Sequence, residues 1–157
     1  MIEKEQEALR RFLLALCCGN RQEAEDIAQE TFIKAYVASP SFVEKFKFTT
    51  WLFKIAYNTF LDKAKRAGGY NIGLEEREVK SVLSHECSDG SFEYEGLYFA
   101  LSSIPLKERT SILLFYIGGY SVRETASIMN CSSGAVRVLL SRGRKRMRKL
   151  LENKNNQ

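Results

Sequence analysis

Six breaks divide this chain into segments of helical length, and no segment has the alternation of a β-strand. The breaks are Gly19-Asn20, Ser39-Pro40-Ser41, Gly68-Gly69, Pro105, Gly118-Gly119 and Asn130-Cys131-Ser132. Between them, apolar residues recur every three or four positions, which is the period of an amphipathic helix. The pattern therefore predicts an all-α fold made of short helices.

The first half of the chain predicts three helices, over about 4–18, 20–38 and 51–67. Expected inner residues are Leu9, Phe12, Leu13, Leu16, Ala24, Ile27, Ala28, Phe32, Ala35, Leu52, Phe53, Ile55, Ala56, Thr59 and Phe60. Gly19 is expected to end the first helix, and Asn20 with Glu23 forms a capping-box pattern for the second. Thr49 or Thr50 is expected to cap the third. Such helices make one small helical domain, placed at 1–67.

Residues 68–91 lose this period and are rich in acidic and small residues. We expect a flexible linker, with room for a short helix at 74–83. A second small helical domain is expected over 92–157. It should contain a helix ending before Pro105 and another over 106–117. Expected inner residues of the latter are Leu106, Thr110, Leu113, Leu114 and Ile117.

The sequence S-V-R-E at 121–124 is a second capping-box pattern and starts a further helix. Asn130 interrupts that helix, because asparagine tolerates the left-handed conformation of a tight turn. Ser132 or Ser133 then caps a long final helix. The segment 121–151 is thus predicted to be a helix-turn-helix. The residues expected to close its core are Ala126, Val136 and Leu139, and Leu139 or Leu140 is expected on the same face of the last helix as Val136.

The final helix is strongly basic, with six Lys or Arg among the eight residues 142–149. Its cations turn outward from the predicted apolar face, together with Ser141. Such a helix can enter the major groove of DNA, with its first turns on base edges and later cations on phosphates. A merely solvated face and a membrane surface are the alternatives. The membrane alternative is disfavoured because no large aromatic residue accompanies the cations.

Two stretches of the first half carry unusual side chains. Residues 25–30 place three acids and one amide on one side of a helix. Glu25 and Gln29 are i,i+4 neighbours, as are Asp26 and Glu30. This patch suits a protein partner that bears Arg and Lys, although a solvated acidic face is the better explanation when the patch is taken alone. Residues 45–63 interleave lysines with aromatic rings, a combination that suits unstacked bases beside phosphates. Phe53 and Phe60 are the rings expected to pack inside.

Several functional classes are disfavoured by the sequence. No apolar run approaches the roughly 20 residues that cross a bilayer, and the first residues do not resemble a signal peptide, so we expect a cytoplasmic protein. The four cysteines lack paired spacing, and His85 with Cys87 supplies too few ligands for zinc. We therefore expect no metal and no cofactor.

An enzyme acting on nucleic acid is a third class to weigh. No nucleophile–base pair, carboxylate cluster or glycine-rich phosphate loop supports one, and a single histidine is poor material for acid–base chemistry. Asp62, the only acid among the basic residues of the third helix, is the residue such an enzyme would need. We expect no enzymatic activity.

Five motifs, taken together, resemble one known family. They are A-E-D-I-A-Q-E-T-F (24–32), W-L-F-K-I-A-Y-N-x-x-x-D (51–62), I-P-L-K-E-R (104–109), G-Y-S-V-R-E-T-A (119–126) and G-A-V-R-V-L-L-S-R-G-R (134–144). In order and spacing they resemble the extracytoplasmic-function (ECF) subfamily of the bacterial sigma-70 family of RNA polymerase sigma factors. The resemblance covers nearly the whole chain.

The resemblance implies an alternative sigma factor with sigma region 2 at 1–67 and sigma region 4 at 92–157. Region 2 would bind the clamp helices of the largest subunit of core RNA polymerase through Asp26, Gln29 and Glu30. It would also capture the melted −10 element through Lys45, Lys47, Trp51, Asn58, Lys63 and Arg66. Region 4 would contact the beta flap and read the −35 element through Ser133, Arg137, Val138, Ser141, Arg142, Arg144 and Lys145. An anti-sigma factor is a further implied partner.

The chain departs from the family pattern at a few positions. Ala135 replaces the usual threonine, Val138 and Leu139 replace common serine and arginine, and Thr125 replaces isoleucine. We expect altered base reading, with Val138 able to touch a thymine methyl, and slightly weaker packing at Thr125. A stand-alone helix-turn-helix regulator is the runner-up. It explains 119–151 but leaves the acidic patch and the aromatic stretch without a role.

Overall fold

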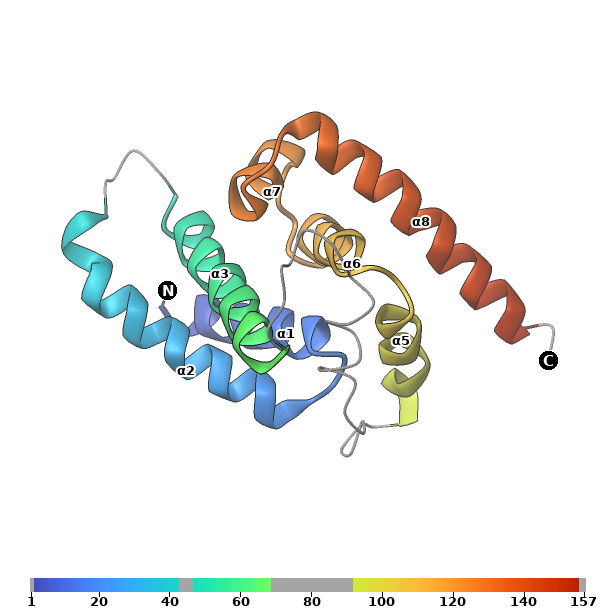
Figure 1. Ribbon diagram of the computed structural model, residues 1–157, viewed down its shortest axis with the longest axis horizontal. Coiled ribbons are helices and arrows are strands. Elements are labelled where there is room, and N and C mark those ends of the chain that lie inside the picture. The colour runs from blue at the N-terminus through green and yellow to red at the C-terminus, as the bar shows by residue number, and fades with distance from the viewer. Residues whose placement is uncertain (1, 43–46, 69–91, 156–157) are drawn as a thin grey trace.

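The computed structural model describes residues 2–42, 47–68 and 92–155, and every regular element in these ranges is helical. The N-terminal elements are α1 (Ile2–Leu16), α2 (Arg21–Ala38), the 3-10 turn η1 (Ser39–Ser41) and α3 (Phe48–Gly68). The C-terminal elements are α5 (Phe92–Ser102), α6 (Leu106–Ile112), the π-helical turn η2 (Leu113–Ile117), α7 (Val122–Met129) and α8 (Ser133–Asn155). Figure 1 shows α1–α3 in one half and α5–α8 in the other, with α8 along the outer edge. The all-α prediction is confirmed.

The three N-terminal helices bury the faces that their apolar period predicts. All the predicted inner residues are buried except Phe32 and Ile55, which are half-buried. Phe12 of α1 packs on Phe53 of α3 with ring centroids 5.3 Å apart, so aromatic contact joins these two helices. Phe60 is completely buried, as predicted.

The turn between α1 and α2 follows the prediction in part. Gly19 is left-handed with φ 89°, and Cys18 before it is also left-handed with φ 55°. Asn20 Oδ1 accepts a hydrogen bond from the Glu23 N–H at 3.2 Å, which caps α2. The Glu23 carboxylate, however, pairs with Lys63 of α3. The Glu23 side chain therefore pairs with α3 and does not complete the capping box predicted for α2.

The prediction that Thr49 or Thr50 caps α3 is wrong. The helix begins at Phe48, and the Trp51 N–H donates to the Lys47 carbonyl at 3.1 Å. The two threonine side chains instead bond to residues of the C-terminal half, Thr49 to Tyr120 and Thr50 to Glu124. Their hydroxyls are therefore engaged in a tertiary contact.

The predicted inner position of Ile117 is also wrong, since this side chain is 61% exposed. The predicted helix over 106–117 changes after Ile112 into the π-helical turn η2, with a hydrogen bond from the Gly118 N–H to the Leu113 carbonyl at 2.9 Å. A π turn holds more residues than an α turn, so it rotates the following side chains away from the predicted face. Leu113 and Leu114, which come first, stay buried.

The two halves of the chain share one apolar core. The C-terminal half adds to the cluster of α1–α3 the residues Leu101, Ile104, Leu106, Leu113, Leu114, Ile128 and Met129. A polar contact accompanies them, because the buried Arg109 donates from Nη1 to the Leu16 carbonyl at 2.7 Å. Residues 69–91, and with them the predicted short helix, His85 and Cys87, lie outside the described residues.

Candidate nucleic-acid interface

Three local features fix the turn of the helix-turn-helix. The predicted capping box is complete, since Ser121 Oγ accepts from the Glu124 N–H at 3.0 Å and Glu124 Oε1 accepts from the Ser121 N–H at 3.1 Å. Asn130 ends α7 in the left-handed conformation, with φ 56°. Ser132 Oγ accepts from the Ala135 N–H at 3.1 Å, so Ser132 rather than Ser133 caps α8.

The inner face of α8 packs on α7 and α6. Ala126, Val136 and Leu140 are buried together. The predicted closing residue Leu139 is only half-buried, and Leu140 takes its place. Gly143 lies where α8 meets α6, and a Cβ atom there would be 2.4 Å from Ile112 Cδ1. The terminal methyl of Ile112 would have to move to admit a side chain at this position, so Gly143 favours the close approach of α8 to α6.

The outer face of α8 carries the predicted −35 residues. Ser133 is half-buried, and the exposed ones are Arg137, Val138, Ser141, Arg142, Arg144 and Lys145. Arg144 donates from Nη1 to the Tyr116 hydroxyl at 2.9 Å. Among the described residues, no carboxylate pairs with Arg137, Arg142 or Lys145, so these charges are available to a polyanion. Val138 is 47% exposed and adds an apolar spot beside them.

Arg146 differs from its basic neighbours. Its Nε lies 2.8 Å from Oε2 of Glu108, a buried carboxylate on α6. This ion pair helps to hold α8 against α6. Arg146 is therefore a packing residue within an otherwise outward-facing run of cations.

The outward face of α3 begins with an aromatic cluster. The Trp51 ring lies 5.1 Å from that of Phe42 and 5.7 Å from that of Phe48, centroid to centroid. Phe48 is exposed and Trp51 half-buried, and Asn58 is exposed two turns further along. The Lys47 ammonium lies 3.4 Å from Glu124 Oε2 of α7. Lys45 lies outside the described residues.

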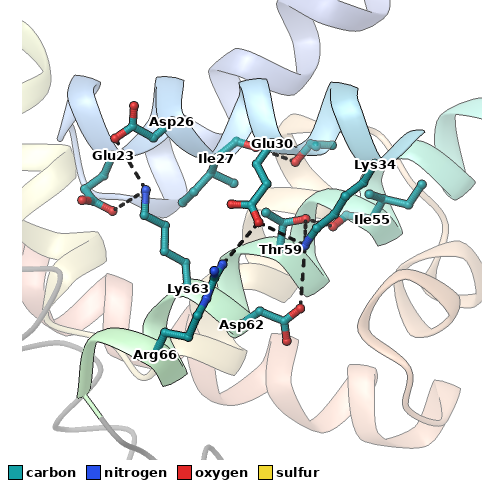
Figure 2. Close-up of polar contacts among 11 residues, drawn as sticks. Glu23, Asp26, Ile27, Glu30, Lys34, Ile55, Thr59, Asp62, Lys63 and Arg66 are labelled. Carbon is teal, nitrogen blue, oxygen red and sulfur yellow. Dashed lines mark hydrogen bonds and ion pairs between the residues drawn. The ribbon is translucent and has the colours of Figure 1, made fainter. Parts of the chain in front are cut away.

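The edges of α2 and α3 that face each other are joined by a network of ion pairs (Figure 2). Lys63 Nζ lies 3.5 Å from Asp26 Oδ2 and 3.7 Å from Glu23 Oε2. Two carboxylates of α2 thus partly neutralise one candidate −10 residue. One of them, Asp26, is itself a candidate for polymerase contact, so the structure brings members of two predicted sites together.

Glu30 of this network, like Lys63, contacts more than one oppositely charged side chain. It accepts from Arg66 at 3.2 Å and lies 3.4 Å from Lys34 Nζ, which also approaches Asp62 Oδ2 at 3.8 Å. Partial burial opposes ionisation of Glu30, but Lys34 and Arg66 outweigh it and hold the pKa of the carboxyl below its ordinary value. Gln29, on the adjacent face, is exposed.

Other chemistries find little support in the described ranges. They contain no group of three His, Cys, Asp or Glu side chains placed to hold a metal ion. Cys17 and Cys18 are buried thiols and Cys131 is an exposed one. Nor do these ranges include a helix that combines the length and apolar character of a membrane span.

The two halves match two family models in order. Residues 1–69 match sigma-70 region 2, and residues 94–147 match sigma-70 region 4. The ECF RNA polymerase sigma factor SigW of Bacillus subtilis is 38% identical over 145 residues, covering 85% of this chain and 78% of that protein. The chain belongs to the ECF sigma factors. EcfG of Rhodopseudomonas palustris is 27% identical to this ECF sigma factor, over 92% of the chain and 79% of the relative.

Solved structures resemble nearly the whole of this chain. The sigma factor RpoE of Bartonella quintana, in complex with the anti-sigma factor NepR, superposes with a TM-score of 0.75 at 27% identity. This match covers 96% of the chain and 94% of that protein. CnrH, in complex with the cytosolic domain of CnrY, superposes with a TM-score of 0.67 at 25% identity, over 97% and 85% of the two chains.

The exposed residues of this sigma factor include two groups absent from the predicted sites. Ile33, Tyr36 and Val37 of α2 are 65%, 82% and 73% exposed and continue the helical spacing of Asp26 and Gln29. The apolar stripe Ile33-Tyr36-Val37 therefore extends the candidate polymerase-binding face. Ile33 and Tyr36 follow Gln29 by four and seven positions, and this helical spacing is the sequence signal that could have revealed the stripe.

The second group is basic. Lys54 and Lys65 follow Trp51 at helical spacing on the outward face of α3, with Lys54 half-buried and Lys65 exposed. Lys54 follows Trp51 by three positions and Lys65 follows Asn58 by seven. This helical spacing is the sequence signal that could have revealed both lysines. Lys54 also lines a pocket with Ala126, Ser127, Asn130 and Cys131 of the helix-turn-helix, so Lys65 is the more open of these two candidates.

Proposed function

We propose that this ECF sigma factor binds core RNA polymerase, reads the −35 element with α8 and opens the −10 element with α3. One observation carries the proposal: a region 2 with an aromatic, basic α3 and a region 4 with a capped helix-turn-helix occur in order in one chain. A stand-alone regulator is not favoured, because it leaves the match over residues 1–69 without a role. As a polymerase subunit it would act in the cytoplasm and need no catalytic site of its own.

The −35 contact uses the outer face of α8. Arginine forms bidentate hydrogen bonds to guanine in the major groove, and an apolar group contacts the thymine methyl. Arg137 and Val138, in the first turns of the helix, would read bases. Ser133, Ser141, Arg142, Arg144 and Lys145 would fix the register, chiefly on phosphates.

The −10 contact uses the outward face of α3. An aromatic side chain contributes about 1–3 kcal/mol per stacked base, without needing a paired strand. Trp51 would stack on a base extruded from the melted strand, and Asn58 would contact a base edge. Phosphates would lie along Lys45, Lys47 and Lys54. Lys63 and Arg66 would contribute less than expected, because both are already paired with carboxylates of α2.

The polymerase contact uses the exposed face of α2. Protein interfaces combine an apolar centre with a polar rim. The stripe Ile33-Tyr36-Val37 would supply the centre, and Asp26 and Gln29 the rim toward the clamp helices of the largest subunit. Glu30 would act mainly by holding α2 on α3. Region 4 would contact the beta flap in the same complex.

An anti-sigma factor is the further proposed partner. One solved relative of similar fold is a complex with an anti-sigma factor, and a second is a complex with the cytosolic domain of CnrY. Their likeness over nearly the whole chain supports a partner of this kind for this sigma factor. The inducing signal would act through release of that partner.

The test is transcription with purified components. The sigma factor is mixed with bacterial core polymerase and genomic promoter fragments, and transcript starts are mapped. Starts that share one two-part upstream sequence, and that vanish without the protein, are the expected result. Binding to duplex sites without polymerase, together with no effect on core transcription, would leave only the stand-alone regulator.

A further inference from the structure

The candidate −10 helix and the helix-turn-helix contact each other directly (Figure 1). One carboxylate lies at the centre of this contact. Glu124 completes the capping box of α7 with Oε1, while its Oε2 lies 3.4 Å from Lys47 Nζ and 3.5 Å from Thr50 Oγ1. Glu124 thus ties the start of α7 to the start of α3.

An aromatic contact reinforces this tie. Tyr120, one residue before the cap of α7, packs on Phe53 of α3 with ring centroids 5.1 Å apart. Its side chain also hydrogen-bonds to that of Thr49. Burial raises the pKa of Tyr120 to about 12, so the phenol keeps its proton at neutral pH. The contact therefore combines an ion pair, hydrogen bonds and apolar packing.

Promoter geometry is incompatible with this contact. The −10 and −35 elements are about 25 base pairs apart, which is roughly 85 Å of duplex at 3.4 Å per base pair. The recognition helix α8 has 23 residues and is about 35 Å long at 1.5 Å per residue. Because α7 leads directly into α8 and touches α3, the closed chain cannot place α3 and α8 on both elements at once.

We propose that the α3–α7 contact, made by Lys47, Thr50 and Phe53 with Tyr120 and Glu124, is an autoinhibitory latch within the chain. The latch holds the two DNA-binding regions together and occupies Lys47, a proposed phosphate contact, with a carboxylate. It rests on the proposed function, since the closed state matters only if both promoter elements must be reached. Polymerase and promoter bind the open form and shift the equilibrium toward it.

The latch has a measurable consequence for affinity. A partner that binds only the open form has an apparent affinity reduced by the open fraction. An exposed ion pair contributes a factor of about two to five to such an equilibrium. Removing the charge of Glu124 should therefore raise the apparent affinity of the sigma factor for promoter complexes by about two- to fivefold.

Small-angle X-ray scattering of the free, full-length protein is the first measurement. The wild-type chain should have a radius of gyration near 15 Å, as expected for a compact chain of this length. Thr50→Glu places a second carboxylate beside Glu124, at a helix start where glutamate is favourable, and should raise the radius by several ångströms. Thr50→Gln, of the same size without the charge, is the matched control and should stay closer to wild type.

The second measurement is transcription at limiting sigma factor from a promoter mapped with the wild type. Glu124→Gln keeps the capping box, because glutamine also accepts the Ser121 N–H, but loses the charge facing Lys47. It should halve or further lower the half-saturating concentration, whereas Glu7→Gln, which removes an ion pair within α1, should not change it. An expanded wild-type chain, or Thr50→Glu as compact as Thr50→Gln, would overturn the latch. Wild-type protein that fails to initiate at all would instead overturn the proposed function.

Discussion

Gly143 of α8 faces Ile112 of α6 so closely that a Cβ atom on the glycine would displace the Ile112 side chain. The Gly143→Leu variant should therefore lose about 1–3 kcal/mol of stability through overpacking, with α8 displaced from its seat. Thermal or urea unfolding measures this loss. Gly134→Leu, at a position on the same helix with open space around it, should unfold no earlier than wild type. Equal destabilisation by the two substitutions would contradict close packing at Gly143.

Arg142 and Arg146 should respond differently to alanine. Arg142 is exposed and unpaired among the described residues, so Arg142→Ala should weaken −35 binding and lower the log–log salt slope by about 0.9 if one phosphate contact is lost. Arg146→Ala removes the partner of a buried glutamate and should instead cost about 1–2 kcal/mol of folding stability. Binding isotherms of holoenzyme at several salt concentrations, with melting curves, separate the two effects. An unchanged slope for Arg142→Ala would mean that it touches no phosphate.

Trp51 should contribute to the binding of the melted −10 strand but not to the binding of the −35 duplex. Trp51→Ala should weaken binding of holoenzyme to a promoter carrying a pre-melted −10 segment by about 1–3 kcal/mol, the value of one stacked base. Trp51→Phe keeps a ring and should retain most of the affinity. Binding to a −35 duplex fragment provides the comparison. A similar loss on both DNAs would indicate general damage to the fold.

The apolar stripe on α2 predicts a separation between stability and polymerase binding. Ile33→Asp places a charge at the centre of the proposed interface and should lower the affinity for core polymerase at least about tenfold, because desolvating an unpaired charge is costly. The melting temperature should stay near that of wild type, since Ile33 is exposed. Phe99→Asp, at a similarly exposed apolar residue of α5, is the control. Unchanged polymerase binding by Ile33→Asp would remove the stripe from the interface.

Acid should destabilise the cap of α7 through Glu124. The hydrogen bond from the Ser121 N–H, helped by Lys47, holds the pKa of Glu124 below its ordinary value of 4.5. The folded carboxyl thus binds its proton less readily than the unfolded one. Its stabilisation is complete above about pH 4.5 and is lost as the pH falls through the lowered native value. Urea unfolding between pH 6 and 3 should show a shallower loss for Glu124→Gln, and identical profiles would contradict this role.

Features fixed by neighbouring residues were predictable from the sequence. The cap at Ser121, the left-handed turn at Asn130 and the inward faces of α1–α3 depend on side chains within a few positions of one another. Each follows from hydrogen-bonding capacity or helical period alone. The chemistry of α8 was predictable for the same reason, since exposure of its cations follows from the position of its apolar face.

Features fixed by distant residues were not predictable in this way. Thr49 and Thr50 have good capping chemistry, yet their hydroxyls bond to residues about 70 positions away. The sequence also does not reveal that Lys63 and Arg66 face the acids of α2, because that depends on how two helices pack. Ile117 was misplaced since a single π turn alters the helical period that the prediction assumes.

Arg109 gives the joint between the two halves an unusual property. Its guanidinium donates to the Leu16 carbonyl at the end of α1, inside an interface that is otherwise largely apolar. When the halves separate, water can hydrate both of these groups at once, so part of the contact is exchanged rather than simply lost. A wholly apolar joint would expose only surfaces that adhere to other proteins. The polar contact is therefore expected to make separation of the halves less costly than it would be for a wholly apolar joint of the same area, as the proposed latch requires.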